Sequence, residues 1–318
     1  MPNMLAHCLC GDKAALVMDG DRLRKIINAH HNVFMLGCQG PDYLLYYHAN
    51  PLKSQKRAKE VQHYGSVVHC EKVNEFMQAM AEKAKSDDNE VEMAYVAGFL
   101  CHHALDAIAH PYVNYRTGSA TKKTGYAHQL LEAQMDTGLM DYYKLLPSEY
   151  NPYKLIRISR KDMECLAHFS HQLLNQVYGF NEEYRVIYEC YHDTQSIQHV
   201  LSDPKSNKYN IISKLENLMN IPGMATSMMI PWKYDDKLDA ANFRKDVWKH
   251  SVTGEEHNES FLEMFDKAVQ ESLGNLNSLN DFFFADGSLE PILEVMAGKS
   301  YDSGIRDGKH KYFKADEE

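Results

Sequence analysis

The chain has 318 residues, 44 acidic and 34 basic side chains, a formal net charge of −10 at pH 7 and 44% hydrophobic residues. This length can bury a large core, the acidic balance disfavours nucleic-acid binding through a basic surface, and no apolar run of about 18 residues is present to span a membrane. The start of the chain lacks the basic region and the long apolar stretch of a secretion signal, and seven cysteines favour reduced thiols over a disulfide framework. We therefore expect a cytoplasmic protein without a nucleic-acid partner.

Apolar residues recur at helical spacing through most of the chain, whereas long alternating strand patterns are missing. In chain order, helices are predicted over residues 21–34, 65–85, 90–110, 127–145, 159–178, 181–201, 238–247 and 257–279. Turn-forming residues predict a tight loop at 37–41, a polar break at 85–89 and an exposed loop at 115–125. No repeat or clear linker is present. We therefore expect one all-α multi-helix domain over residues 1–318, in which a helical half, 151–318, packs on residues 1–150 near Pro152.

The most informative segment lies in the predicted helix 90–110. His102, Asp106 and His110 follow one another at intervals of four residues, and His128 and Glu132 repeat this interval eighteen residues further on. Residues four apart lie on one face of a helix, so each run points its imidazoles and carboxylates in one direction. Two such runs facing each other would bring five side chains that suit zinc into one cavity.

Both runs also have a purely structural interpretation. His102, Asp106 and His110 could form a buried hydrogen-bond network, although polar groups on an otherwise apolar helix are costly to bury unless they are paired. His128 and Glu132 could be a solvated pair on a helix surface.

Two upstream residues are further ligand candidates. Asp42 follows a rigid glycine-proline turn that could aim its carboxylate at a metal, but it could equally cap the helix that follows. His69, taken alone, could be a packed or a surface histidine. Considered together with the two runs, these residues predict a divalent metal site in the half of the chain formed by residues 1–150.

The same residues resemble the zinc-dependent phospholipase C family, whose wider superfamily includes the zinc-dependent single-strand nucleases. The segments 35–42 and 97–102 look like the bacterial branch of that family. The family pattern is an early loop Asp, a helical His, a His-x3-Asp pair, a further His and a final His-x3-Glu or His-x3-Asp pair. The resemblance implies an all-helical bundle with a zinc cluster in a cleft and these zinc ligands: Asp42, His69, His102, Asp106, His110, His128 and Glu132. His7 resembles the early histidine that serves a third metal.

The resemblance also implies a function. The protein would be a phosphodiester hydrolase that cleaves a phospholipid or a related phosphoester with metal-activated water. Asp106 would bridge two metals, and Asp42 would orient or deprotonate the attacking water. One zinc would be held by Asp42, His69, His102 and Asp106, and another by His110, His128 and Glu132.

Two features depart from the secreted members of the family. In those members an N-terminal tryptophan binds the third metal, whereas the first tryptophan here is Trp232. The sequence is therefore compatible with two to three zinc ions. The secreted members also place five residues between the aspartate and the next histidine, whereas three residues separate Asp106 from His110. The shorter spacing keeps His110 on the same helix face.

Two other functions remain open. The same cluster could cut a nucleotide or a nucleic-acid phosphoester, as in the zinc-dependent nucleases. Alternatively, the chain could be a metal-binding helical protein without turnover, which would agree with the missing N-terminal tryptophan and the missing export signal.

Overall fold

The computed structural model describes residues 4–49, 53–118, 122–146, 150–203, 207–221, 223, 225–231 and 233–314. These residues form thirteen α-helices, two short 3-10 helices and one antiparallel hairpin, so the prediction of an all-α fold is confirmed. The elements of the first half are α1 Met4–Val17, α2 Asp21–Ala29, α3 His31–Gly37, η1 Gly40–Leu44, α4 Gln55–Cys70, α5 Val73–Asp87, α6 Glu90–Thr117 and α7 Lys122–Tyr143. The elements of the second half are α8 Pro152–Leu155, α9 Arg160–Tyr178, α10 Tyr184–Leu201, α11 Lys208–Leu218, η2 Thr226–Met228, β1 Trp248–Lys249, β2 Glu256–His257, α12 Phe261–Phe284 and α13 Glu290–Met296.

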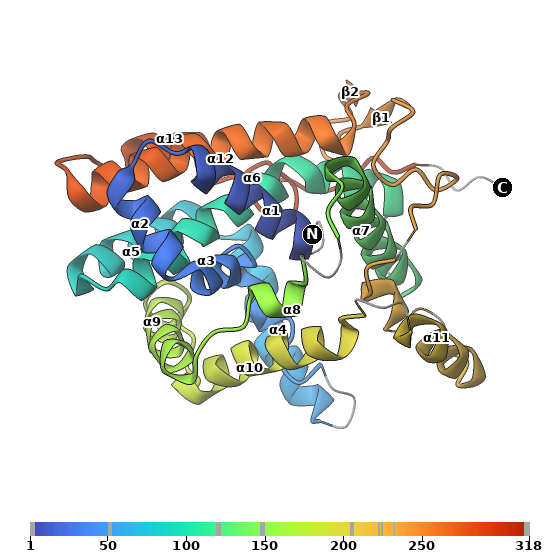
Figure 1. Cartoon of the computed structure of the whole chain (residues 1–318), viewed down its shortest axis with the longest axis horizontal. Helices are drawn as coiled ribbons and strands as arrows, with labels where there is room; N and C mark the ends of the chain where they lie inside the picture. The colour runs from blue at the N-terminus through green and yellow to red at the C-terminus, as the bar shows by residue number, and fades with distance from the viewer. Residues whose placement is uncertain are drawn as a thin grey trace.

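Helix α6 runs through the centre of the bundle (Figure 1). Helices α1, α3, α5, α7, α9 and α12 all pack against it. Every residue from 92 to 107 is buried, which is the pattern of a helix covered on all sides. Polar side chains on this helix therefore lie in the protein interior. Among the described residues, no helix is both long and apolar enough to span a bilayer.

Helices α3 and α6 approach each other so closely that only glycine fits at the crossing. A Cβ on Gly98 would lie 2.1 Å from the carbonyl oxygen of Phe34, and a Cβ on Gly37 would lie 2.3 Å from that of Tyr95. Real Cβ atoms do not approach other atoms so closely. The crossing therefore presses the turn after α3, with Cys38 and then η1, against the polar face of α6.

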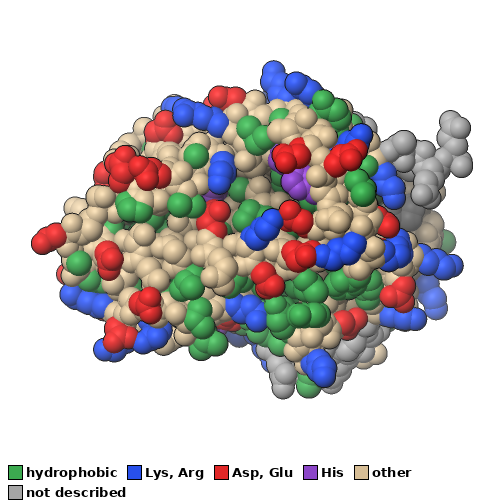
Figure 2. All heavy atoms as spheres, turned by 90° about the horizontal axis from the view of Figure 1, so that it is seen from above, with side chains coloured by type: hydrophobic (Ala, Val, Ile, Leu, Met, Phe, Trp, Pro, Cys, Tyr) green, Lys and Arg blue, Asp and Glu red, His purple; other side chains and the backbone are tan. Residues whose placement is uncertain are grey.

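The second half of the chain covers the first. Helix α12, which begins with a capping box between Ser260 and Glu263, packs on both α1 and α6. Helix α8 begins at Pro152 and packs on α1, α3 and α10. Because of these contacts, we propose that residues 1–318 form one domain. On the face shown in Figure 2, lysines and arginines are scattered among acidic side chains rather than gathered into a basic patch.

Several predicted element bounds were wrong. The predicted helix 21–34 is divided at His30, and the predicted helix 65–85 is divided at Lys72, whose φ of 49° is left-handed. The predicted tight loop 37–41 gives way to η1 from Gly40, and α10 begins only at Tyr184.

Around the predicted exposed loop 115–125, α6 continues to Thr117 and α7 begins at Lys122. Residues 119–121 of that loop lie outside the described residues. Helix α6 passes through Pro111, and its last turns are held by tertiary contacts: the Tyr112 ring packs on Trp248 and its hydroxyl donates to the carbonyl of Ala240.

The predicted helix 238–247 was also wrong, because this segment is a series of turns. Asp239, Asn242 and Lys245 all have positive φ values. The Asp239 carboxylate accepts hydrogen bonds from the backbone N–H groups of Phe243 and Arg244, which stabilises a turn in place of a helix. The next helix begins at Phe261 rather than at 257, since His257 belongs to the β1–β2 hairpin.

Candidate metal centre

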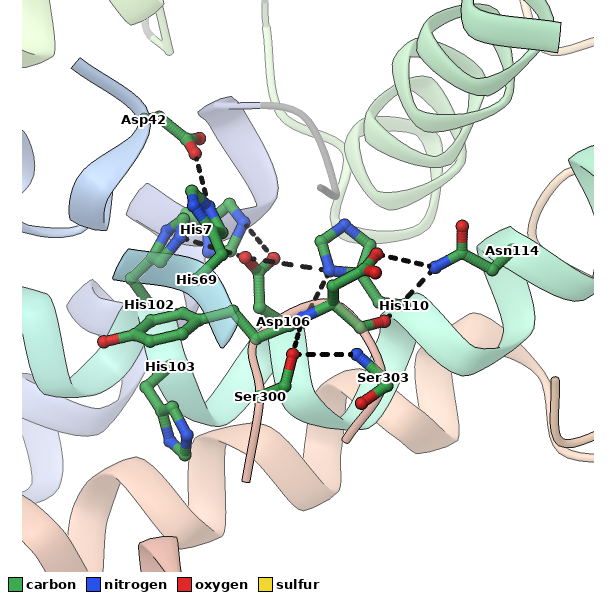
Figure 3. Close-up of polar contacts among 12 residues, drawn as sticks. His7, Asp42, His69, His102, His103, Asp106, His110, Asn114, Ser300 and Ser303 are labelled. Carbon is green, nitrogen blue, oxygen red and sulfur yellow. Dashed lines mark hydrogen bonds and ion pairs between the residues drawn. The ribbon is translucent and has the colours of Figure 1, made fainter. Parts of the chain in front are cut away.

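The eight ligand candidates come from five elements that converge around α6. Figure 3 shows those on α1, η1, α4 and α6: His7, Asp42, His69, His102, Asp106 and His110. His7 lies on α1, Asp42 on η1 and His69 on α4, while three candidates lie on α6 and two on α7. In each of three groups the potential ligand atoms lie within 4.8 Å of one another: His7 with His102 and Asp106, Asp42 with His69 and His102, and His110 with His128 and Glu132. His102 belongs to two of the groups, so these two are contiguous.

Asp106 lies at the centre of the site, fully buried. Its Oδ1 is 3.1 Å from Nε2 of His7, and its Oδ2 is 3.0 Å from Nε2 of His102. The Nδ1 of His110, one turn further along α6, lies 3.8 Å from Oδ2. Asp106 thus belongs to one group and faces His110 of another, as a bridging carboxylate would.

The other two groups lie on either side of Asp106. On one side, Nε2 of His69 is 3.1 Å from Oδ1 of Asp42. On the other side, Oε1 of Glu132 lies 2.9 Å from Nε2 of His128 and 3.6 Å from Nε2 of His110. The runs on α6 and α7 therefore do face each other.

Four of the histidines are oriented by a contact to their Nδ1 atom. The Nδ1–H groups of three of them donate to backbone carbonyls: His69 to Gly65 at 2.7 Å, His102 to Cys38 at 3.0 Å and His110 to Tyr301 at 2.6 Å. The Thr117 hydroxyl donates to the carbonyl of Val113, so it is an acceptor for Nδ1–H of His128 at 3.3 Å. This assignment directs Nε2 of each ring into the site, where that of His69 meets Oδ1 of Asp42, and it is how metal-binding histidines are commonly held.

Burial keeps several of these rings neutral. It lowers the pKa of His7 and of His110 to about 4, and it lowers the pKa of His128 well below its usual value. Burial alone would raise the pKa of Asp106, but the neighbouring His102, His110 and His7 hold it well below its usual value. Neutral imidazoles around an ionised carboxylate are the protonation states in which these groups bind a metal.

The donor set fits a divalent metal. Both ring nitrogens of His7, Nε2 of His102 and both oxygens of Asp106 are buried, and within the described residues none of them makes a well-directed hydrogen bond, although the Asp106 oxygens lie 3.1 and 3.0 Å from Nε2 of His7 and of His102. Leaving buried polar atoms unsatisfied is costly, and a cation among them would satisfy several at once. Imidazole nitrogen and carboxylate oxygen are ordinary zinc ligands.

Gly40 sets the distance between η1 and His102. Its φ is +52°, and a Cβ there would lie 2.1 Å from Cδ2 of His102. We expect Gly40→Ala to displace the imidazole and to lower the zinc content of the purified protein, measured by plasma mass spectrometry. Gly179 is a matched control, because its φ is +68° but a Cβ placed there would meet nothing within 4 Å. Gly179→Ala should cost only the backbone strain, about 1 kcal/mol, with zinc unchanged. Equal zinc in both variants would contradict the proposed role of Gly40.

Two supporting features were missed in the sequence. The Asp136 carboxylate accepts from the backbone N–H groups of Leu5 and Ala6, at 3.2 and 2.9 Å, and so fixes the start of α1 beside His7. A signal for it existed, because Asp136 continues the fourfold spacing of His128 and Glu132 along α7.

The loop at residues 300–303 is the second missed feature. Tyr301 supplies the carbonyl that orients His110, and the Asp302 carboxylate accepts from Asn114 at 3.0 Å and contacts His310 at 2.8 Å. The Ser300 hydroxyl accepts from the backbone N–H of Asp302 and shapes the turn. No sequence signal could have found this loop, since 191 residues separate the carbonyl from His110.

His103, the neighbour of His102 in the sequence, does not join the site. Its Nε2 contacts the carbonyl of Lys299, and its ring packs edge-on against Tyr301. Figure 3 shows the His103 ring turned away from Asp106. Adjacent residues on a helix point about 100° apart, so only one of the two histidines faces Asp106.

The fold and the site define a class: an all-α protein that presents a buried set of histidines and carboxylates suited to divalent metal. A comparison with protein-family models matches residues 6–191 to the family described as zinc-dependent phospholipase C. The match covers more than half of the chain and includes all eight ligand candidates, so the chain belongs to this family. Comparisons with curated proteins and with solved structures gave no match.

Proposed function

We propose that the protein is a phospholipase C-like hydrolase that cleaves a phospholipid or a related phosphoester with zinc-activated water. The observation that supports this most is the convergence of buried histidine nitrogens and carboxylate oxygens on Asp106, several of them without a hydrogen-bond partner among the described residues. Membership of the zinc-dependent family agrees with it. A site built only for stability would give these atoms well-directed hydrogen bonds, whereas the Asp106 oxygens lie at contact distance from His7 and His102 without such bonds.

The three groups would hold two to three zinc ions, with His102 and Asp106 shared between neighbouring positions. When bound, zinc supplies Lewis acidity, which makes water more acidic and neutralises charge on a phosphate group. The chain itself excludes bulk water from the inner part of the site, because His7, His102, Asp106 and His110 are at most 3% exposed. A low local dielectric strengthens each charge interaction with a bound phosphate.

We propose that Asp42 is the general base that accepts a proton from the attacking water. Its carboxylate lies at the outer edge of the site, held through Oδ1 by His69. Tyr46 lies one turn further along the chain and is partly exposed. The pKa of its phenol is raised, mainly by burial and in addition by the nearby charge of Asp42. A neutral phenol in that place can donate a hydrogen bond to a substrate oxygen.

The test is Asp42→Asn, which keeps the shape of the side chain but removes its basicity. We expect kcat on a phosphodiester substrate to fall by about 10²- to 10⁴-fold, the usual contribution of a general base. Asp193→Asn is the matched control, because Asp193 is also buried and also makes an ion pair, with Lys53 at 2.9 Å, but lies outside the three groups. It should keep full activity. If Asp42→Asn retained both zinc and wild-type kcat, Asp42 would not be the base.

A substrate panel separates the competing functions. Zinc-loaded protein should hydrolyse phosphatidylcholine dispersed in detergent, or a chromogenic phosphodiester, and should leave single-stranded DNA uncut. Cleavage of DNA alone would establish the nuclease alternative. Absence of turnover on every substrate, in protein that retains its zinc, would establish the metal-binding alternative.

A further inference from the structure

Helix α11 has an inverted pattern of burial. Its apolar residues Ile211, Leu215 and Leu218 are 61%, 52% and 83% exposed, whereas its acidic residue Glu216 is buried. The three apolar residues are spaced by four and three positions and so form one stripe, which Met219 extends just beyond the helix. A helix of a water-soluble bundle places such a stripe against the core. Figure 1 shows α11 at the edge of the molecule, projecting from the bundle.

Polar contacts hold the helix in this orientation. At its start, the Asp203 carboxylate accepts from the backbone N–H groups of Asn207, Lys208 and Tyr209. Near its end, the Glu216 carboxylate accepts from the backbone N–H groups of Gly223, Ala225 and Thr226 and from the Thr226 hydroxyl. The buried polar groups are satisfied, so the outward direction of the apolar stripe is built into the fold.

The helix is also tied to the metal centre. Segment η2, which the Glu216 contacts fix to α11, packs on α7, where the Ser227 hydroxyl donates to Oε1 of Gln129 at 2.9 Å. Gln129 is the neighbour of His128 in the sequence. The exposed stripe therefore belongs to a surface that flanks the end of α7 carrying two of the ligand candidates.

A largely apolar cavity of about 260 Å³ lies between α7, α8, α10 and η2. Its apolar lining includes Met140, Leu145, Leu146, Leu201, Met228 and Ile230. Leu146 is 55% exposed, so the lining reaches the surface. On its inner side, Gln198 lines the cavity and donates to the hydroxyl of Tyr46, the residue placed beside Asp42 above. The cavity thus opens at the surface, and one of its lining residues contacts Tyr46, which follows Asp42 by one turn.

Charge favours a lipid surface over a second copy of this acidic chain. Of the three charged residues on α11, Glu216 is buried, which leaves two lysines at the surface: Lys214, and Lys208, whose ammonium donates to backbone carbonyls at the end of α10. A basic, apolar helix face on a chain with a formal charge of −10 suits a surface that combines apolar chains with anionic head groups.

We propose that α11 inserts its apolar face into a phospholipid surface and that the cavity lined by η2, which packs on α11, takes an acyl chain of a lipid drawn from that surface. This inference rests on the proposed function for its choice of lipid as the substrate class. It explains in one arrangement why the leucines of α11 are exposed, why Glu216 is tied to η2, and why the cavity that η2 helps to line is largely apolar.

The experiment measures co-sedimentation of the zinc-loaded full-length protein with vesicles of phosphatidylcholine mixed with phosphatidylglycerol. The variant carries Leu215→Glu and Leu218→Glu. The control is Leu16→Glu, because Leu16 is 77% exposed but lies at the far end of α1. We expect the double variant to bind vesicles at least about tenfold more weakly than wild type, because it loses two leucine side chains that would be buried in the lipid. The control should bind as wild type does. Hydrolysis of a water-soluble chromogenic phosphodiester should stay within about twofold for all three.

Equal vesicle binding by wild type and by the double variant, or no binding by wild type, would overturn the proposal. A wild-type dimer in sedimentation equilibrium that the double variant abolishes, without vesicle binding, would assign the stripe to a second copy instead. Failure of the proposed function has a different signature: vesicle binding that depends on Leu215 and Leu218, with no hydrolysis of any phosphoester.

Discussion

Replacing His102 with alanine is expected to weaken zinc binding at the two groups that share this residue and to lower the rate of hydrolysis strongly. His102 belongs to two groups and its Nε2 lies 3.0 Å from the central carboxylate of Asp106. Loss of a residue that merely orients a metal ligand typically costs about 10- to 100-fold in affinity or activity. The loss of a shared ligand should therefore exceed about 100-fold in kcat/KM, and the zinc content of the variant should fall by at least one equivalent.

His103→Ala is the matched control for this variant. His103 is as deeply buried as His102 and one residue away, but it contacts Lys299 and Tyr301 instead of Asp106. Both variants create a cavity and remove a hydrogen bond, so both should lower the melting temperature. Only His102→Ala should lose zinc. Normal zinc content in His102→Ala, or equal loss in both variants, would mean that these histidines act in the core rather than in a metal centre.

Removing the metal is expected to destabilise the whole fold. The ligand candidates come from α1, η1, α4, α6 and α7, so a cation among them would link elements that are distant in the sequence. With free zinc about 1,000-fold above its Kd, each site adds about 4 kcal/mol to the free energy of unfolding. For a chain of this size, that raises the melting temperature by roughly 6 °C per site.

The measurement compares thermal unfolding of zinc-loaded protein with protein dialysed against a chelator. Returning zinc should restore the melting temperature, whereas magnesium should not, because nitrogen ligands favour zinc. The same titration on His102→Ala gives the contribution of the shared positions. Identical melting temperatures with and without chelator, in protein shown to have lost its zinc, would contradict a metal centre that spans these five elements.

Helix prediction succeeded where the pattern is local and failed where tertiary contacts decide. Residues 159–178 were predicted within one position, because the Ser159 side chain caps the helix and the left-handed Gly179 ends it. The helix carrying His7 was not predicted, and the predicted helix 238–247 is a turn region organised by the Asp239 carboxylate. Apolar periodicity could predict neither result. The helix α1 is buried nearly all round at its start and so lacks a polar face, and residues 238–247 are shaped by side-chain hydrogen bonds.

The sequence by itself determined the all-α class and the direction of the two ligand runs. Fourfold spacing on a helix fixes which side chains share a face, and this depends only on local backbone geometry. Only the tertiary structure decided which residues meet: that His7 and His102 flank Asp106, that Asp136 anchors the start of α1, and that the loop at 300–303 orients His110. The outward stripe of α11 was likewise invisible in the sequence, because apolar spacing shows that a helix has an apolar face but not whether the protein itself covers that face.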